Sequence, residues 1–122
     1  MKITPIPIKG TDVRGYTAEY MHERSGDQLL LFRKAGTSGG RHYHKGISAN
    51  KNPEVFIVVH GDCILNWKHI DDTEIQSCKL SGPVRLDIPP FIWHEVVTVT
   101  DCVSLEMNSI DEHVADLFFL EK

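Results

Sequence analysis

The chain has 122 residues, of which 41% are hydrophobic and 25% are charged, as is typical of one globular domain. Its formal net charge is −4 and its basic residues are scattered, which excludes the clustered basic face that nucleic-acid binding needs. No apolar run approaches the ~20 residues of a membrane-spanning helix, and the first residues are too polar for a signal peptide. We therefore expect a single domain over residues 1–122, located in the cytoplasm, with no nucleic-acid or membrane partner.

The N-terminal segment is the first element in chain order. Its apolar residues Ile3, Ile6 and Ile8 are separated by Pro5 and Pro7. Because proline removes a hydrogen bond from the ladder, this segment can form only an edge strand or an extended arm. A domain of this size buries such residues best against the sheet edge of a second copy. The segment therefore predicts a homodimer.

From residue 28 onward, short apolar runs alternate with turn residues. We expect strands at 28–33, 55–59, 63–68, 73–80, 84–88, 95–100 and 103–107. Gly61 and Asp62 are expected at the tip of a hairpin. Strands at this spacing are typical of an antiparallel sandwich or barrel. Only residues 111–120 suit a helix, with Asp111 as its N-cap and an apolar face, and a terminal strand fits the same residues.

Two imidazoles lie two positions apart, at His42 and His44. On a strand, such side chains share a face and start roughly 6–7 Å apart, so both can reach one ion at ~2.0–2.1 Å. Glu54 opens the next expected strand and His94 begins a later one, and both can join the same site. Three imidazoles and one carboxylate suit zinc, manganese, iron or nickel. We therefore expect these four side chains to hold one divalent metal ion.

The spacing of these residues carries a resemblance to a known superfamily. Five residues separate Gly36 from His42, His44 follows, and six residues separate Glu54 from Gly61. With the later histidine, this pattern over residues 36–98 resembles the two conserved motifs of the cupins. The resemblance implies an all-β fold, a cupin (double-stranded β-helix or jelly-roll) barrel, and the same four metal ligands.

The chain departs from the cupin pattern between His44 and Glu54. Nine residues separate the two, more than the motif has, so a loop over residues 45–53 is inserted. A register slip of one residue would turn Glu54 outward. Long loops often carry function, and this one is a candidate lid over the site.

Shorter strings resemble two groups of carbohydrate-active cupins. Segments 41–45, 92–95 and 101–103 are similar to the small cupins that isomerise 4-keto nucleotide sugars at C3 and C4. Segments 52–56 and 87–90 are similar to cupin domains of capsular polysaccharide enzymes that epimerise keto sugars. The resemblance implies an isomerase or epimerase that moves a proton next to the carbonyl of a sugar derivative. A metal-dependent dioxygenase and a non-catalytic ligand-binding cupin are the alternatives.

Further side chains are candidates for chemistry or binding. We expect the proton to be moved by His42 or His44 if no metal binds, with Tyr43 and Glu106 as weaker candidates. A phosphate or carboxylate can be bound by Arg33, Arg41 or Lys45, and a sugar can stack on Trp93. We expect the binding residues, together with Glu106, to lie around the substrate. The remaining histidines have no partners at useful spacing, so we interpret them as structural or exposed: His22, His60, His69 and His113.

Overall fold

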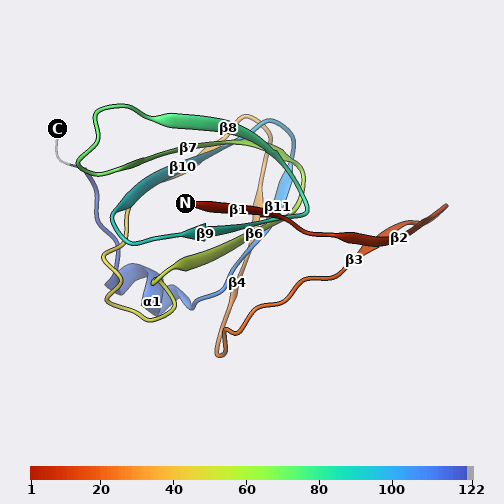
Figure 1. Cartoon of the computed structure of the whole chain (residues 1–122), viewed down its shortest axis with the longest axis horizontal. Helices are drawn as coiled ribbons and strands as arrows, with labels where there is room; N and C mark the ends of the chain where they lie inside the picture. The colour runs from red at the N-terminus through yellow and green to blue at the C-terminus, as the bar shows by residue number, and fades with distance from the viewer. Residues whose placement is uncertain (121–122) are drawn as a thin grey trace.

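The computed structural model describes residues 1–120 and is built almost entirely from strands, with one short helix among those residues (Figure 1). The elements are β1 (Lys2–Pro5), β2 (Ile8–Asp12), β3 (Gly15–Ala18), β4 (Leu29–Arg33), β5 (Ser38–His42), β6 (Glu54–His60), β7 (Asp62–His69), β8 (Gln76–Ser81), β9 (Val84–Ile88), β10 (Ile92–Thr98), β11 (Cys102–Glu106) and α1 (Ile110–Ala115). The described helix is too short and too polar to span a membrane.

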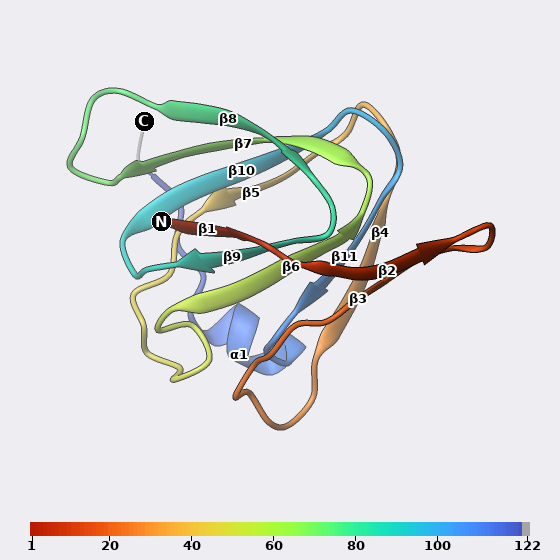
Figure 2. The same cartoon turned by 45° about the vertical axis from the view of Figure 1, so that its right-hand side comes forward.

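Two antiparallel sheets form the barrel. The first has the strand order β1-β9-β6-β11-β4 and the second has the order β5-β10-β7-β8, and Figure 2 shows them curving around a common interior. Along β9, Val84, Leu86 and Ile88 are buried while the residues between them are partly exposed, so one face of the strand points inward. These residues pack with Leu65 of β7 and Ile92 of β10 in a core between the sheets. The predicted all-β cupin barrel is confirmed.

Each expected strand has an observed counterpart within a few residues, and β6 and β7 meet at the predicted Gly61–Asp62 hairpin, but β5 lies outside the expected ranges. β1 is an edge strand, as its prolines require, and it pairs with β9. The β2–β3 hairpin was not anticipated. It projects away from the barrel (Figure 2) and every residue of β2 is exposed, so its sequence shows no alternation of buried and exposed positions.

The helix differs from its prediction at both ends. Its N-cap is Ser109 rather than Asp111, and a capping box joins Ser109 to Glu112. It ends at Ala115 and buries none of its side chains, so the expected apolar face is wrong. The chain then extends, and Phe118 forms a β-bridge with Tyr43. Residues 111–120 therefore combine the two interpretations, a helix followed by an extended segment.

Candidate functional site

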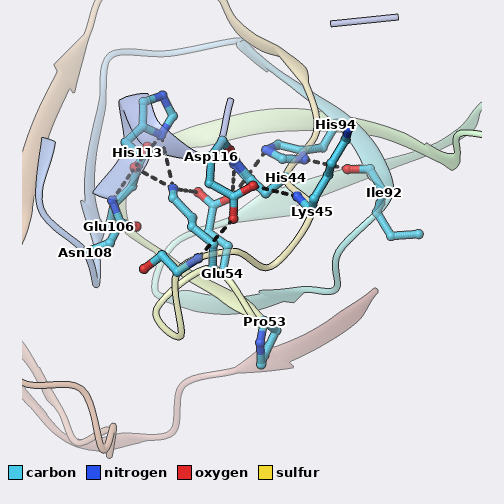
Figure 3. Close-up of polar contacts among 12 residues, drawn as sticks. His44, Lys45, Pro53, Glu54, Ile92, His94, Glu106, Asn108, His113 and Asp116 are labelled. Carbon is cyan, nitrogen blue, oxygen red and sulfur yellow. Dashed lines mark hydrogen bonds and ion pairs between the residues drawn. The ribbon is translucent and has the colours of Figure 1, made fainter. Parts of the chain in front are cut away.

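Three of the predicted ligands converge at one end of the barrel interior (Figure 3). Glu54 is the first residue of β6, His94 lies on the inward face of β10, and His44 follows β5. The Oε2 atom of Glu54 lies 2.9 Å from Nε2 of His44 and 3.4 Å from Nε2 of His94. All three side chains are buried. The inserted loop has therefore not turned Glu54 outward.

Backbone carbonyls fix the orientation of two of the rings. Nδ1 of His94 lies 3.0 Å from the carbonyl oxygen of Ile92, and Nδ1 of His44 contacts that of Asp116. A neutral ring that donates through Nδ1 keeps a lone pair on Nε2. Nε2 of His44 and Oε2 of Glu54 are buried without a hydrogen-bond partner among the described residues. Because unsatisfied buried acceptors are unfavourable, this donor set fits a metal ion, with the carbonyls as its outer support.

His42 stands beside this group. Its ring centroid lies 4.9 Å from those of both His44 and His94, and 5.2 Å from that of His113. Two overlapping groups of side chains could each hold a metal ion, because their potential ligand atoms lie within 4.8 Å of one another. One group is His44, Glu54 and His94, and the other is His42, His44 and His113. The expectation that His113 has no partner was wrong. It lies on α1, far along the chain, so local spacing gave no sign of it.

Lys51 is the second site residue that the sequence did not indicate. Its side chain is fully buried, and its Nζ atom lies 3.3 Å from Oε1 of Glu54 and 3.5 Å from Oε2 of Glu106. Nδ1 of His113 lies 3.1 Å from the same nitrogen. Nothing in the sequence distinguishes this lysine from others in polar loops. The inserted loop delivers it to the site.

The loop over residues 45–53 is held on both sides. The carboxylate of Asp116 accepts hydrogen bonds from the backbone N–H groups of Lys45 and Ile47, at 2.7 and 2.8 Å. On the other side, Arg24 donates to the carbonyls of Ala49 and Pro53, at 3.0 and 2.7 Å. The predicted lid is therefore a fixed wall of the site.

Burial and neighbouring charges set the protonation of the site. Burial and the nearby imidazoles lower the pKa of His42 to about 3, and burial lowers the pKa of His94. Burial alone would raise the pKa of Glu54, but the close approach of the His44 ring and the charges of His94 and Lys51 hold that pKa well below its usual value. Neutral imidazoles beside an ionised carboxylate are the form that binds a metal ion.

A cavity of about 80 Å³ extends from these residues between the two sheets. Polar side chains line its inner end, namely His42, Glu54, His94 and Glu106. Apolar side chains line much of the rest, including Leu31, Phe56, Cys63, Val96 and Cys102. The exposed lining residues Arg33, Thr37 and Gly40 place the mouth between the facing edges of β4 and β5. Of the predicted binding residues, Arg33 and Glu106 therefore border the cavity.

Tyr43, a predicted proton-transfer residue, lies away from the cavity. Because it alternates with His42 and His44, its ring points to the opposite side of the chain. There it packs against Phe91 and Phe118, with ring centroids 6.4 and 5.8 Å away. The structure gives this tyrosine a packing role.

Arg41, Lys45 and Trp93 also lie outside the cavity. Nε of Arg41 lies 3.4 Å from Oε2 of Glu95 on the outer surface. The ammonium of Lys45 lies 4.2 Å from the centroid of the Phe118 ring. Trp93 stands between two inward residues of β10, so its side chain faces outward. These three residues are close to the histidines in sequence, but their side chains do not lie beside the histidines in the structure.

The family model for the polysaccharide biosynthesis C-terminal domain matches residues 10–113. The chain belongs to this family. A comparison of this polysaccharide biosynthesis domain with curated protein sequences found no significant match.

Several solved structures share the fold, and their names refer to polysaccharide assembly or to sugar isomerisation and epimerisation. CapF, a capsular polysaccharide assembling protein from Staphylococcus aureus, is 27% identical, with a TM-score of 0.61 over 97% of this chain and 35% of CapF. The chain thus spans about a third of CapF. QdtA, a sugar 3,4-ketoisomerase from Thermoanaerobacterium thermosaccharolyticum, is 21% identical, with a TM-score of 0.70 over 96% of this chain and 85% of QdtA. The 3,5-epimerase RmlC from Legionella pneumophila is 17% identical, with a TM-score of 0.68 over 98% and 71%. Both resemblances drawn from the sequence, to cupins and to sugar isomerases and epimerases, are confirmed at the level of the fold, and the family model connects the chain with polysaccharide biosynthesis.

Proposed function

We propose that this domain holds one divalent metal ion, zinc, manganese, iron or nickel, and isomerises or epimerises a keto sugar, free or nucleotide-linked. The observation that carries the proposal is the convergence of Nε2 of His44, Nε2 of His94 and the unpartnered Oε2 of Glu54 at the inner end of a cavity. Two of the three named structural relatives are a sugar 3,4-ketoisomerase, in complex with TDP, and a 3,5-epimerase, which supports a sugar substrate.

The reaction would remove and return a proton next to a carbonyl. When bound, the ion supplies Lewis acidity that polarises the carbonyl. His44, His94 and Glu54 would hold it, and His42 is close enough to join them. The apolar wall of the cavity excludes water and suits a carbon-rich part of the sugar, such as a methyl group.

Two side chains on the cavity wall can move the proton. His42 is neutral at neutral pH, because its pKa is lowered to about 3, and so can accept a proton only weakly. Burial and the charge of Glu54 raise the pKa of Glu106, which moves this carboxyl toward the range in which it can both accept and return a proton. Glu106 is therefore the stronger base when the histidines hold a metal, and His42 the base if they do not.

Arg33 is the arginine best placed to bind a phosphate. It borders the mouth of the cavity, whereas Arg41 is engaged with Glu95 on the outer surface. A guanidinium binds a phosphate through two parallel hydrogen bonds. We expect Arg33 to bind the phosphate groups of a nucleotide sugar while the sugar enters the cavity.

Metal content tests the first half of the proposal. Protein purified without an affinity metal column should contain about one divalent ion per chain by elemental analysis. His94→Ala should lose it, and His69→Ala, which changes an imidazole outside both candidate ligand sets, should retain it. A wild-type protein that stays metal-free after incubation with all four metals would contradict metal binding. The histidines would then have to transfer the proton without a metal ion.

Exchange with heavy water tests the second half. The protein should wash deuterium into a 4-keto-6-deoxy nucleotide sugar at the carbon next to the carbonyl. Exchange should be lost in Glu106→Gln assayed at saturating metal, weakened in Arg33→Ala, and unchanged in Arg41→Ala. Absence of exchange with several nucleotides would contradict the isomerase proposal.

The alternative is a metal-dependent dioxygenase, and the apolar lining of the cavity is the observation that favours it. The same donors leave coordination positions open for oxygen and substrate. Iron in the purified protein together with oxygen consumption would establish this reading. Ligand binding without either reaction would leave a non-catalytic cupin.

A further inference from the structure

The carboxylate of Glu54 faces two ways. Its Oε2 atom points to His44 and His94, where a metal ion is proposed, at 2.9 and 3.4 Å. Its Oε1 atom lies 3.3 Å from Nζ of Lys51. A single buried carboxylate thus stands between the Lys51 side chain and the proposed position of a bound metal ion.

Contacts with three side chains hold Lys51 in this position. Its ammonium is surrounded by Glu54, Glu106 and Nδ1 of His113, and the residue is fully buried. The loop that carries it is held by the carboxylate of Asp116 and by Arg24. Because the side chain is fully buried, bulk solvent screens its charge less than it screens a charge on the surface.

We propose that Lys51 is a positioning residue that acts through Glu54. It competes with the metal ion for the negative charge of this carboxylate, so that the carboxylate neutralises less of the positive charge of the bound ion. This inference rests on the metal site of the proposed function. The inserted loop between His44 and Glu54 thereby acquires a role, because it carries the lysine to the ligand. An ion that keeps more of its positive charge is a stronger partner for an oxygen that becomes negative.

The inference makes a prediction of sign that a purely structural role does not. If Lys51 repels the ion, replacing it with a neutral residue tightens metal binding even though it destabilises the metal-free fold. The ammonium of Lys51 is shared between Glu54 and Glu106. If Glu106 is replaced with glutamine, Lys51 pairs with Glu54 alone, and metal binding becomes weaker. Two buried polar substitutions would thus shift metal affinity in opposite directions.

The test is a charge series measured on the whole chain. Zinc dissociation constants are determined by chelator competition at about pH 8, where carboxylates are ionised, for Lys51→Gln, Lys51→Met, Glu106→Gln and the exposed control Lys79→Gln. Unfolding temperatures of the metal-free proteins are measured beside them. We expect zinc to bind at least tenfold more tightly to either Lys51 variant, at least threefold more weakly to Glu106→Gln, and unchanged to the control.

The outcomes separate the two proposals. A wild-type protein that binds no metal overturns the proposed metal site and this inference with it. If the wild type binds zinc, folded Lys51 variants that bind it equally or more weakly overturn the inference alone. If neither Lys51 variant folds, Glu106→Gln decides, and unchanged or tighter zinc binding in that variant overturns the inference.

Discussion

The histidines of the site are buried in their uncharged form, which ties the stability of the protein to pH. The pKa of His42 is lowered from 6.5 to about 3, mainly by burial, and the pKa of His113 is lowered to about 4 for the same reason. An unfolded chain would bind protons at these side chains already near pH 6.5. The folded protein therefore binds fewer protons than the unfolded one between about pH 6.5 and the lowered values, and loses stability as the pH falls through that window.

We expect the unfolding temperature of the metal-free protein to be constant above about pH 7 and to fall steadily below about 6.5. Each imidazole contributes a slope of about 1.4 kcal/mol per pH unit at most. His42→Gln should lower this slope by up to about 1.4 kcal/mol per pH unit, the contribution of one proton. Thermal melts over a pH series measure this, and equal slopes in wild type and His42→Gln would contradict it.

At the scale of single residues, the sequence indicates the candidate ligands but not the residues that support them. His42, His44, Glu54 and His94 could be predicted because their spacing matches a motif, and strand alternation also places Glu54 and His94 on inward faces. The supporting residues come from a loop and a C-terminal segment, where no periodicity fixes the direction of a side chain. These are Lys51, His113 and Asp116.

At the scale of elements, the inserted loop depends on one buried carboxylate. Asp116 is fully buried and accepts hydrogen bonds from the backbone N–H groups of Lys45, Ile47 and Ser48. Asp116→Ala leaves these donors without partners, at roughly 1–3 kcal/mol for a buried unsatisfied group. We expect a total loss of about 2–4 kcal/mol in the free energy of unfolding, measured in urea. The exposed Asp111→Ala is the control, and equal stability of the two variants would contradict the prediction.

The helix α1 depends on its cap because it buries none of its own side chains. The Ser109 side chain accepts a hydrogen bond from the backbone N–H of Glu112, whose carboxylate accepts one from the backbone N–H of Ser109 in return. Ser109→Ala should lower the free energy of unfolding by about 1 kcal/mol. It should also weaken the packing of His113 against His42, since the helix carries His113. Urea denaturation beside the exposed Ser77→Ala measures the effect, and a loss no larger than in that control would show that packing alone holds the helix.

The strands of the barrel could be predicted because burial on one face imposes a period of two on β9 and β10. The β2–β3 hairpin could not, since neither of its faces is buried by the barrel and its residues follow no such period. The residue at which α1 ends could not be predicted either. The helix ends before Asp116, whose carboxylate accepts hydrogen bonds from a loop about 70 residues earlier in the chain. Local sequence does not encode a partner at that distance.

At the scale of the whole molecule, exposed apolar side chains lie on β4 and on the β2–β3 hairpin. Leu30 and Phe32 lie on the outer face of β4, at the edge of the five-stranded sheet, and are 74% and 54% exposed. The projecting β2–β3 hairpin adds exposed Ile8 and Tyr16. Clustered exposed apolar residues mark interaction sites rather than ordinary surface, and an exposed edge strand favours pairing with another chain.

We therefore expect this chain to form a homodimer through the outer face of β4 and the β2–β3 hairpin. Light scattering should give a mass near twice the 13.8 kDa of the chain. Leu30→Glu with Phe32→Glu should give monomers that stay folded, because both side chains are exposed in the single chain and the charges are unfavourable only once buried. Ile75→Glu, an equally exposed position before β8, should leave the dimer intact. A wild-type mass of 13.8 kDa over a wide concentration range would contradict the dimer, and loss of dimer in Ile75→Glu alone would move the interface to the opposite sheet.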